Sequence, residues 1–312
     1  MNFIIENQKL IRYIGTDAEV IIPDGITEIA PNAFEGCVHM TSITFPSSVT
    51  NVGEWAFYGC RNLKAVYIDN LATWCNINFE TDASNPLHFA NNLYVNNALV
   101  QELIIPAEVT TISAYAFDSC ECLKSVIISS ATTKIGERAF DNCTNIKEVS
   151  LPNEMSSIES GAFSGCCSLD SISIPSQITT INDWTFYGCS SLKSVLIPDS
   201  VTRIGDKSFC DCTNISELHL GKNVGRIGEQ AFELCEGLTS ITFPESLKTI
   251  DGYAFSMCSG LEQMTLPKTI TSIGDYAFSG CSNLQCVEIS SKFKKTTDNI
   301  FGYHRNLEIR FI

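Results

Sequence analysis

Cysteine is the residue type in this 312-residue chain with the clearest capacity for chemistry, and there are fifteen of them. Thiols can pair as disulfides, ligate a metal or attack an electrophile, and their spacing decides which of these is open to them. Ten of the fifteen stand three residues after a phenylalanine in a recurring pattern: Cys37, Cys60, Cys120, Cys143, Cys166, Cys189, Cys212, Cys235, Cys258 and Cys281. A position repeated this often indicates a structural role along the chain, and no single active site.

Disulfide bonding is the first alternative for this cysteine series. If equivalent residues stack on neighbouring parallel strands, their spacing is ~4.8 Å, which a distance test alone would allow. A disulfide also needs Cβ atoms about 3.8 Å apart and a torsion near 90°, which an in-register stack does not supply. Buried free cysteine behaves as a small hydrophobic residue. We therefore expect fifteen free thiols that serve packing.

Metal binding is the second alternative, and the spacing disfavours it. The chain has no C-x-x-C motif; it has C-x-C at Cys120/Cys122 and at Cys210/Cys212. Structural zinc sites need two ligand pairs that converge tetrahedrally. The additional cysteines occupy different positions of the repeat and are expected not to converge; they are Cys122, Cys167, Cys210 and Cys286. We predict no metal and no cofactor.

Hydrolytic chemistry has little support in the four histidines, which are His39, His88, His219 and His304. None belongs to an H-E-x-x-H motif, and the chain has no G-x-S-x-G or Walker-type loop. The sequence therefore predicts no catalytic residues and a non-enzymatic protein. Because a triad can assemble across distant segments without a motif, carbohydrate hydrolysis by carboxylates stays open as a distant alternative.

The cysteines belong to a repeat of 23 residues, which is visible in the phenylalanine series from Phe117 to Phe301 and in Phe34 and Phe57. Within each copy, a stretch such as "LKSVLIP" alternates apolar and polar residues, which predicts a short strand that the proline ends. A second extended stretch such as "VTRI" follows, and "GDYAF" then turns the chain through a short helical or 3₁₀ turn. Positions two and five residues after each phenylalanine favour glycine or asparagine, which predicts two left-handed turn residues.

A 23-residue unit cannot bury its apolar edge alone, so the copies must stack into a solenoid. About thirteen coils at ~4.8 Å each would make a rod or arc roughly 60 Å long. We expect a single domain over 1–312, with an N-terminal cap (1–23), regular repeats (24–68), an irregular inserted coil (69–100), regular repeats (101–290) and a C-terminal cap (291–312). The insertion is expected to be a longer coil that rejoins the stack; a protruding loop bearing Trp74 and Phe79 is the functional alternative.

The pattern F-x-x-C-x-x-L-x-x-V-x-I-P-x-x-V-x-x-I-G-x-x-A-F resembles the BspA-like, or Treponema pallidum-type, leucine-rich repeat over nearly the whole chain. The resemblance implies a curved leucine-rich-repeat solenoid, a right-handed β/α-type superhelix whose short strands form a parallel sheet. It also implies roles in adhesion or protein–protein contact, often at bacterial or protist surfaces. The family has no shared catalytic residues to transfer to this chain.

Exposed positions that depart from the polar consensus are the candidate binding residues. On the strands these are Tyr67, Ile127, Leu196 and His219; near the turns they are Trp55, Tyr58, Trp184 and Tyr187. Aromatic side chains are enriched at binding hot spots. Packing along an edge of the solenoid is the alternative explanation for the turn aromatics. A protein, including a host or surface protein, or a glycan is the expected partner, and a surface spacer without a specific site is the alternative function.

The formal charge of −15 and the pI near 4.6 exclude a nucleic-acid backbone as the natural partner, since that affinity comes from clustered Lys and Arg. No apolar run approaches the ~20 residues of a membrane helix, so no membrane insertion is expected. We expect a monomer. The resemblance implies a secreted or cell-surface location, whereas the first residues lack the features of a signal peptide, which leaves a cytoplasmic location open.

Overall fold

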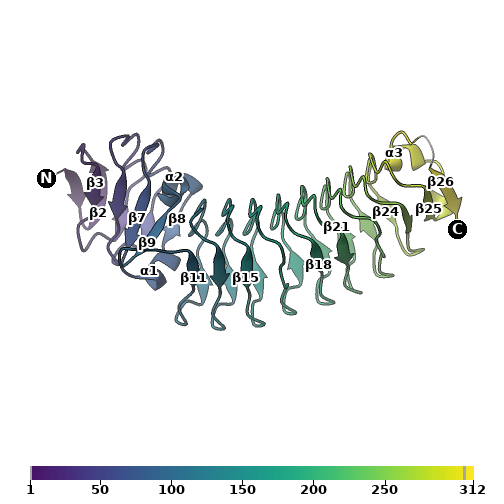
Figure 1. The fold of residues 1–312 in the computed structure, drawn as a ribbon, viewed down its shortest axis with the longest axis horizontal. Helices are drawn as coiled ribbons and strands as arrows, with labels where there is room; N and C mark the ends of the chain where they lie inside the picture. Colours follow the sequence, from purple (N-terminus) through teal and green to yellow (C-terminus); the bar gives the residue numbers. More distant parts are fainter. Residues whose placement is uncertain (1, 305–306) are drawn as a thin grey trace.

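The computed structural model describes residues 2–304 and 307–312, which form a long, curved stack of about 13 turns. Figure 1 shows the chain running from one end of the arc to the other, with the termini far apart. Each turn of the stack, called a coil here, carries one copy of the repeat and contacts the coils before and after it. The leucine-rich-repeat solenoid expected from the repeat is therefore confirmed.

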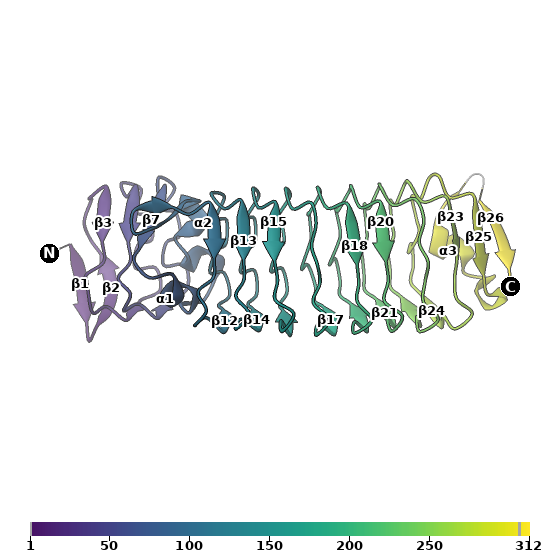
Figure 2. The same cartoon turned by 60° about the horizontal axis from the view of Figure 1, so that its bottom comes forward.

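Two rows of parallel strands run along the solenoid, side by side in Figure 2. The long-strand row consists of β3 (Glu19–Ile21), β5 (Ser42–Thr44), β7 (Ala65–Ile68), β9 (Leu93–Val95), β11 (Glu102–Ile104), β13 (Ser125–Ile127), β15 (Glu148–Ser150), β18 (Ser194–Leu196), β20 (Glu217–His219), β23 (Gln263–Thr265), β25 (Cys286–Ile289) and β26 (Glu308–Phe311), with β10 (Ala98–Leu99) antiparallel to β9. The short-strand row consists of β2 (Lys9–Tyr13), β4 (Glu28–Ile29), β6 (Asn51–Val52), β8 (Asn78–Phe79), β12 (Thr111–Ile112), β14 (Lys134–Ile135), β16 (Ser157–Ile158), β17 (Thr180–Ile181), β19 (Arg203–Ile204), β21 (Arg226–Ile227), β22 (Thr249–Ile250) and β24 (Ser272–Ile273), with β1 (Phe3–Glu6) antiparallel to β2.

The strands follow the period-two pattern of the sequence. In β18, Val195 is buried, while Ser194 and Leu196 on either side of it are exposed. The register between coils is one repeat, so Val195 lies beside Leu218 and Ile204 beside Ile227. Equivalent apolar side chains therefore stack directly on one another and form a continuous core.

Helices are short and few: α1 (Leu71–Cys75), η1 (Asp82–Ser84), α2 (Leu87–Ala90), η2 (Ser291–Phe293) and α3 (Thr297–Phe301). Among the residues that the structure describes, none of these helices is long and apolar enough to span a bilayer. The expectation of a helical turn in every regular coil is wrong. The turns there hold single hydrogen bonds, such as Cys189 N–H to the Phe186 carbonyl at 3.2 Å. Gly188 inside this turn (φ 69°) and Trp184 just before it (φ 61°) are left-handed, and they stop the chain from continuing as a helix.

The two predicted left-handed positions have different outcomes. The position two residues after each phenylalanine is left-handed, and Leu234 (φ 62°) and Met257 (φ 60°) adopt the same conformation as the glycines. The position five residues after is not left-handed. Its asparagines instead donate side-chain hydrogen bonds to the coil before, as Asn214 Nδ2 does to the Ser190 carbonyl at 2.7 Å. Asparagine is used there for its amide group.

Phenylalanine and cysteine form adjacent ladders inside the stack. Phe209 is fully buried and lies parallel to Phe186 and Phe232, with ring centroids 5.2 and 5.3 Å away. Cys212 donates its S–H to the Phe186 carbonyl of the preceding coil at 3.1 Å. The same contact recurs 26 residues apart in the other regular coils, for Cys60, Cys143, Cys166, Cys189, Cys235, Cys258 and Cys281. Cysteine therefore combines a small apolar volume with a weak second donor to a carbonyl that already accepts a backbone N–H.

Candidate binding surfaces

The strand face is the outward surface at the third residue of the long strands. It holds four of the eight residues singled out in the sequence: Tyr67 on β7, Ile127 on β13, Leu196 on β18 and His219 on β20. The register places Leu196 directly beside His219. It also places Tyr67 beside Tyr94, and their rings stack with centroids 4.7 Å apart.

Two further apolar residues of the strand face were missed in the sequence. Ile21 and Ile104 are 68% and 59% exposed, which compares with 66% for Leu196 and 41% for Ile127. No repeat phenylalanine stands ten residues before either of them, so a count forward from each phenylalanine misses both. The signal was present as the 23-residue offset, because Ile21 pairs with Thr44 and Ile104 pairs with Ile127. Exposed isoleucine and leucine on one strand face are the strongest indication of a contact surface.

The strand face is hollowed towards the C-terminal end. One hollow of about 570 Å³ lies over β23, β25 and β26, where Thr265, Glu288 and Arg310 line it. Its neighbour of about 490 Å³ includes His219 and Thr242. Both open widely to solvent and have mixed polar and apolar walls, so they are suited to side chains of a partner better than to an enclosed small molecule.

The other four candidates lie at the turns, on a different edge of the coils, which we call the turn edge. Trp55, Tyr58 and Trp184 are 52%, 57% and 39% exposed, and Tyr187 is half-buried. Trp184 packs against Tyr187 at 4.9 Å, and the ammonium group of Lys207 in the next coil lies 4.3 Å from the Trp184 ring centroid. Trp184 and Tyr187 therefore contact each other and the next coil along the edge. The strand-face and turn-edge candidates form two separate sets.

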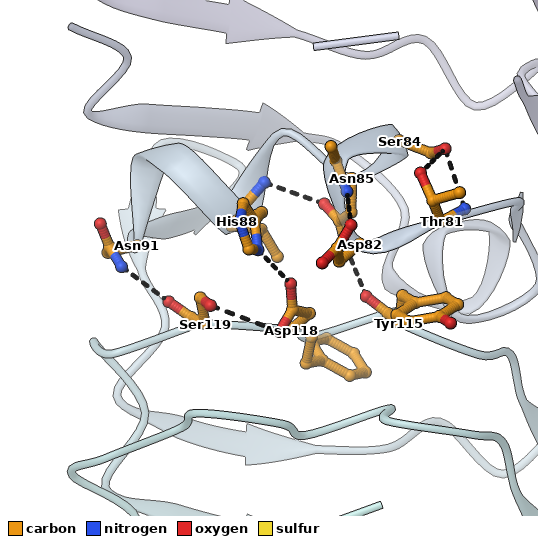
Figure 3. Close-up of polar contacts among 12 residues, drawn as sticks. Thr81, Asp82, Ser84, Asn85, His88, Asn91, Tyr115, Asp118 and Ser119 are labelled. Carbon is orange, nitrogen blue, oxygen red and sulfur yellow. Dashed lines mark hydrogen bonds and ion pairs between the residues drawn. The ribbon is translucent and has the colours of Figure 1, made fainter. Parts of the chain in front are cut away.

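A polar cluster joins the irregular coil to the next regular one (Figure 3). His88 Nδ1 lies 2.7 Å from Asp118 Oδ2, and the Asp118 side chain is only 1% exposed. The hydrogen bond from Asp118 raises the pKa of His88 above its usual value, while burial raises the pKa of Asp118 and His88 opposes that change. Among the described residues, Asp118 is the one side chain hydrogen-bonded to the imidazole. Ser119 Oγ donates to the other carboxylate oxygen, Asp118 Oδ1, at 3.3 Å. The pair therefore belongs to a hydrogen-bonded cluster that joins the two coils.

Buried donors in the irregular coil complete the backbone hydrogen bonding of the next coil. In regular coils the residue before each phenylalanine accepts a hydrogen bond from the previous phenylalanine N–H, as Ala139 does from Phe117. For Ala116 the donors are instead Trp74 Nε1 at 2.8 Å and Asn85 Nδ2 at 3.0 Å. Trp74 and Phe79 are 1% and 2% exposed, so the alternative of a protruding loop bearing them is wrong. Both rings lie in the continuous hydrophobic core of the stack.

One prediction concerns Asp141, a carboxylate close to Asp118. Burial raises the pKa of Asp141 to about 6, the charge of Asp118 raises it further, and a hydrogen bond with Ser164 opposes both. Because the folded pKa lies above the unfolded value near 3.9, this group's contribution is fully present below that value and is lost as the pH rises through about 6. We expect Asp141→Asn to raise the free energy of unfolding at pH 7.5 by about 1–2 kcal/mol.

Urea unfolding at pH 4 and pH 7.5 tests this prediction. The fall in stability between the two pH values should be smaller in Asp141→Asn than in the parent chain by the same amount. Asp170→Asn removes an exposed carboxylate on a nearby coil and serves as the control. If the free energy of unfolding depended on pH equally in the parent chain and in Asp141→Asn, ionisation of Asp141 would not destabilise the folded chain, and the prediction would be wrong.

The comparisons with known proteins agree with this architecture. The model of the BspA type leucine rich repeat region matches the chain in six copies, over residues 16–93, 88–216 and 179–308. A search of curated proteins finds no match. Among solved structures, a leucine rich cell surface protein from Faecalibacterium prausnitzii is 23% identical, with a TM-score of 0.61 and coverage of 97% of this chain and 96% of that one. The pneumococcal vaccine antigen PcpA is 19% identical, with a TM-score of 0.59 and coverage of 97% and 81%.

The structural matches show the shared fold, and the family model identifies the type of repeat. It covers the chain from the first coils to the last, with the phenylalanine and cysteine ladders as its interior. The chain belongs to the family of BspA-type leucine-rich-repeat proteins.

Proposed function

We propose that this chain is a non-enzymatic scaffold that binds a protein through its strand face. The leucine-rich-repeat family is generally a scaffold of this kind, typical of surface proteins and of protein interaction. One observation carries the assignment to the strand face: Ile21, Ile104 and Leu196 are each more than half exposed at the same strand position. Ile104 lies directly beside Ile127 in the register, and contiguous exposed apolar side chains of this kind are typical of interaction sites.

The hydrogen bonding of the strand face leaves recognition to its side chains. The backbone groups of the inner long strands are paired with the strands of neighbouring coils, so a partner could add a strand only at a sheet edge such as β3 or β26. The aromatic pair Tyr67 and Tyr94 and the neighbours Leu196 and His219 supply amphipathic contacts beside the apolar residues. The formal charge of −15 favours a basic or neutral partner.

The turn edge supports this proposal less well. Trp184 packs on Tyr187 and under Lys207, and these contacts account for the presence of this pair without a ligand. Glycan binding is the second candidate, because the hollow lined by Thr265, Glu288 and Arg310 offers hydroxyl, carboxylate and guanidinium groups on one surface. Adhesion at a cell surface would follow from either kind of partner.

A variant that uses the repeat's own residues tests the strand face. Ile21, Ile104, Ile127 and Leu196 are replaced together by threonine, the residue that stands at this strand position in Thr44, Thr242 and Thr265. The variant should therefore fold normally. Panels of purified surface proteins and immobilised glycans are screened with the parent chain. We expect protein binding that the fourfold variant weakens at least about tenfold, with unchanged thermal unfolding.

The matched control alters the turn edge in the same way. Trp55→Gln and Trp184→Gln use the residue of Gln230, while Tyr58→Ser and Tyr187→Ser use the residue of Ser164 at the equivalent positions. This control should bind as the parent chain does. Loss of binding in the control alone would transfer the site to the turn edge. Binding only to glycans would favour the second candidate, and no binding in either panel would favour a spacer without a specific site.

A further inference from the structure

The two thiols of the first C-x-C motif lie close together in the first regular coil after the insertion, next to the irregular coil. Cys120 Sγ and Cys122 Sγ are 3.5 Å apart, and Cys122 is partly exposed. The repeat gives no indication of this contact, because Cys120 belongs to the interior ladder and Cys122 to the position five residues after the phenylalanine. The position of Cys122 is usually occupied by asparagine or glycine, as in Asn145 of the next coil.

The irregular coil explains why Cys120 turns towards Cys122. In the regular ladder each cysteine S–H is hydrogen-bonded to the carbonyl of the phenylalanine 26 residues before it, as Cys143 is to Phe117 at 3.0 Å. The residue 26 before Cys120 is Tyr94 on strand β9, so the phenylalanine turn that would supply the carbonyl is missing there. Among the described residues, the one sulfur or oxygen atom hydrogen-bonded to Cys120 Sγ is the sulfur of Cys122.

The surroundings of Cys122 favour its thiolate. The Leu93 backbone N–H donates to Cys122 Sγ at 3.4 Å, and the Cys120 thiol lies within hydrogen-bonding distance of the same sulfur. The hydrogen bond from Cys120 is the largest cause that lowers the pKa of Cys122 to about 7, and burial opposes it. Burial raises the pKa of Cys120 well above its usual value. The outer sulfur is therefore the nucleophile of the pair and the inner sulfur is the proton-bearing partner.

We propose that Cys120 and Cys122 form an oxidisable dithiol, which a hydroperoxide converts into an intramolecular disulfide. In the first step the Cys122 thiolate attacks the terminal oxygen of the peroxide. The O–O bond breaks, Cys122 becomes a sulfenic acid, and the departing alkoxide takes a proton to form an alcohol, or water when the oxidant is hydrogen peroxide. In the second step the Cys120 sulfur attacks the Cys122 sulfur. The proton of Cys120 leaves with the hydroxide as water.

The two thiols lose two electrons in total, and the peroxide is reduced by the same two electrons. The sulfur atoms must approach from 3.5 Å to the ~2.05 Å of a disulfide bond. Forming this bond moves the two side chains and removes the Cys122 thiolate that accepts from the Leu93 N–H. Oxidation therefore alters the contact between strand β9 and the first regular coil after the insertion.

The second C-x-C motif provides an internal comparison with the same spacing. Cys212 donates to the Phe186 carbonyl like the other ladder residues, and Cys210 Sγ lies 3.9 Å from the Glu233 carboxylate. Burial and the charge of Glu233 raise the pKa of Cys210 to about 12. Cys210 is buried. The second motif therefore lacks both the paired sulfurs and the exposed thiolate, and it should not react.

The experiment uses the folded full chain with hydrogen peroxide as the oxidant and peptide mass mapping as the readout. We expect the first product to be a disulfide that joins Cys120 and Cys122, with two of the fifteen thiols lost after denaturation. Cys122→Asn, which uses the usual residue of that position, should form no disulfide there. In Cys120→Ala the reaction should stop at a sulfenic acid on Cys122, which dimedone traps. Cys210→Ser is the control and should oxidise like the parent chain.

A second readout follows the reactivity of the reduced protein. The rate of Cys122 alkylation by iodoacetamide should rise with a midpoint near pH 7 and exceed that of the half-buried Cys167 by about threefold at neutral pH. Cys120→Ala should move this midpoint upwards, because the main donor to the thiolate is gone. Oxidation of another cysteine before Cys122, or an unchanged reaction in Cys122→Asn, would overturn the proposal. A midpoint that does not move in Cys120→Ala would also overturn it.

Discussion

Phe209→Ala is expected to reduce the free energy of unfolding by ~3–5 kcal/mol, among the largest effects of any single substitution in the chain. Phe209 is fully buried in the middle of the stack, with a parallel ring on each side at 5.2 and 5.3 Å. Truncation removes both ring contacts and leaves a cavity that the strands cannot close, because backbone hydrogen bonds to both neighbouring coils fix the spacing. Urea unfolding followed by circular dichroism measures the loss.

Phe301→Ala is the matched control for this prediction. Phe301 is buried as well, but it has a parallel ring on one side only, Phe278 at 5.8 Å. It lies in α3, in the last part of the stack, where the chain can relax into the space. The loss should therefore be smaller than for Phe209→Ala. Equal losses at the two positions would argue against a capping role for the C-terminal segment.

Trp74→Ala is the second substitution with a large expected effect, ~3–5 kcal/mol from the lost indole and the cavity. Its ring packs edge-on against Phe45 at 5.3 Å and fills the place where the phenylalanine ladder is interrupted between Phe57 and Phe117. Its Nε1 also donates to the Ala116 carbonyl. The change therefore weakens the junction between the first coils and the rest of the stack.

We expect Trp74→Ala to make unfolding less cooperative, since a solenoid is held together only by contacts between neighbouring coils. Hydrogen exchange followed by mass spectrometry should show residues 2–68 losing protection at lower urea concentration than residues 101–290. The shorter stack has fewer coils to stabilise it. Loss of protection at one urea concentration throughout the chain would contradict this expectation.

Trp74→Phe and Asn85→Leu separate packing from hydrogen bonding at this junction. Both residues donate to the Ala116 carbonyl, so either single change leaves that carbonyl with one donor. The double variant leaves it with neither, and a buried unpaired carbonyl costs ~1–3 kcal/mol. The double variant should therefore lose more stability than the sum of the single variants. Strict additivity would show that the two donors act independently.

The arrangement of the regular coils could be predicted from the sequence because it depends on a repeating pattern. Each copy places Phe, Cys and Leu at the same positions, and a unit too small to fold alone can bury them only by stacking. The outward direction of Leu196 and Ile127 follows from the same argument, since strand residues alternate between faces. The same alternation predicts that Ile21 and Ile104 face outwards. They were missed only because no repeat phenylalanine stands ten residues before them.

The backbone conformation of the turns was less accessible. Trp184 and Tyr253 adopt left-handed conformations at φ 61° and 56°, which local preference disfavours for aromatic residues. Hydrogen bonds to the neighbouring coil hold them there, such as Trp184 N–H to the Asp206 carbonyl at 2.9 Å. The same contacts between coils explain why the asparagine position is not left-handed. Neither result could follow from the residues of one copy alone.

By itself, the sequence determined the repeat, the solenoid, the interior ladders and the set of strand positions that face outwards, because these depend on periodicity. Only the tertiary structure decided what happens where the period is broken. Trp74 and Asn85 turn inwards to serve the Ala116 carbonyl, His88 pairs with buried Asp118, and Cys120 turns to Cys122. In each case the neighbouring coil lacks the hydrogen-bonding group that a regular repeat supplies. For Ala116 and Asp118 the hydrogen-bonding group comes from a residue about 30 to 42 positions away in sequence. For Cys120 it comes from Cys122, two positions away. Such contacts depend on which unpaired groups meet in space, and no repeating pattern records them.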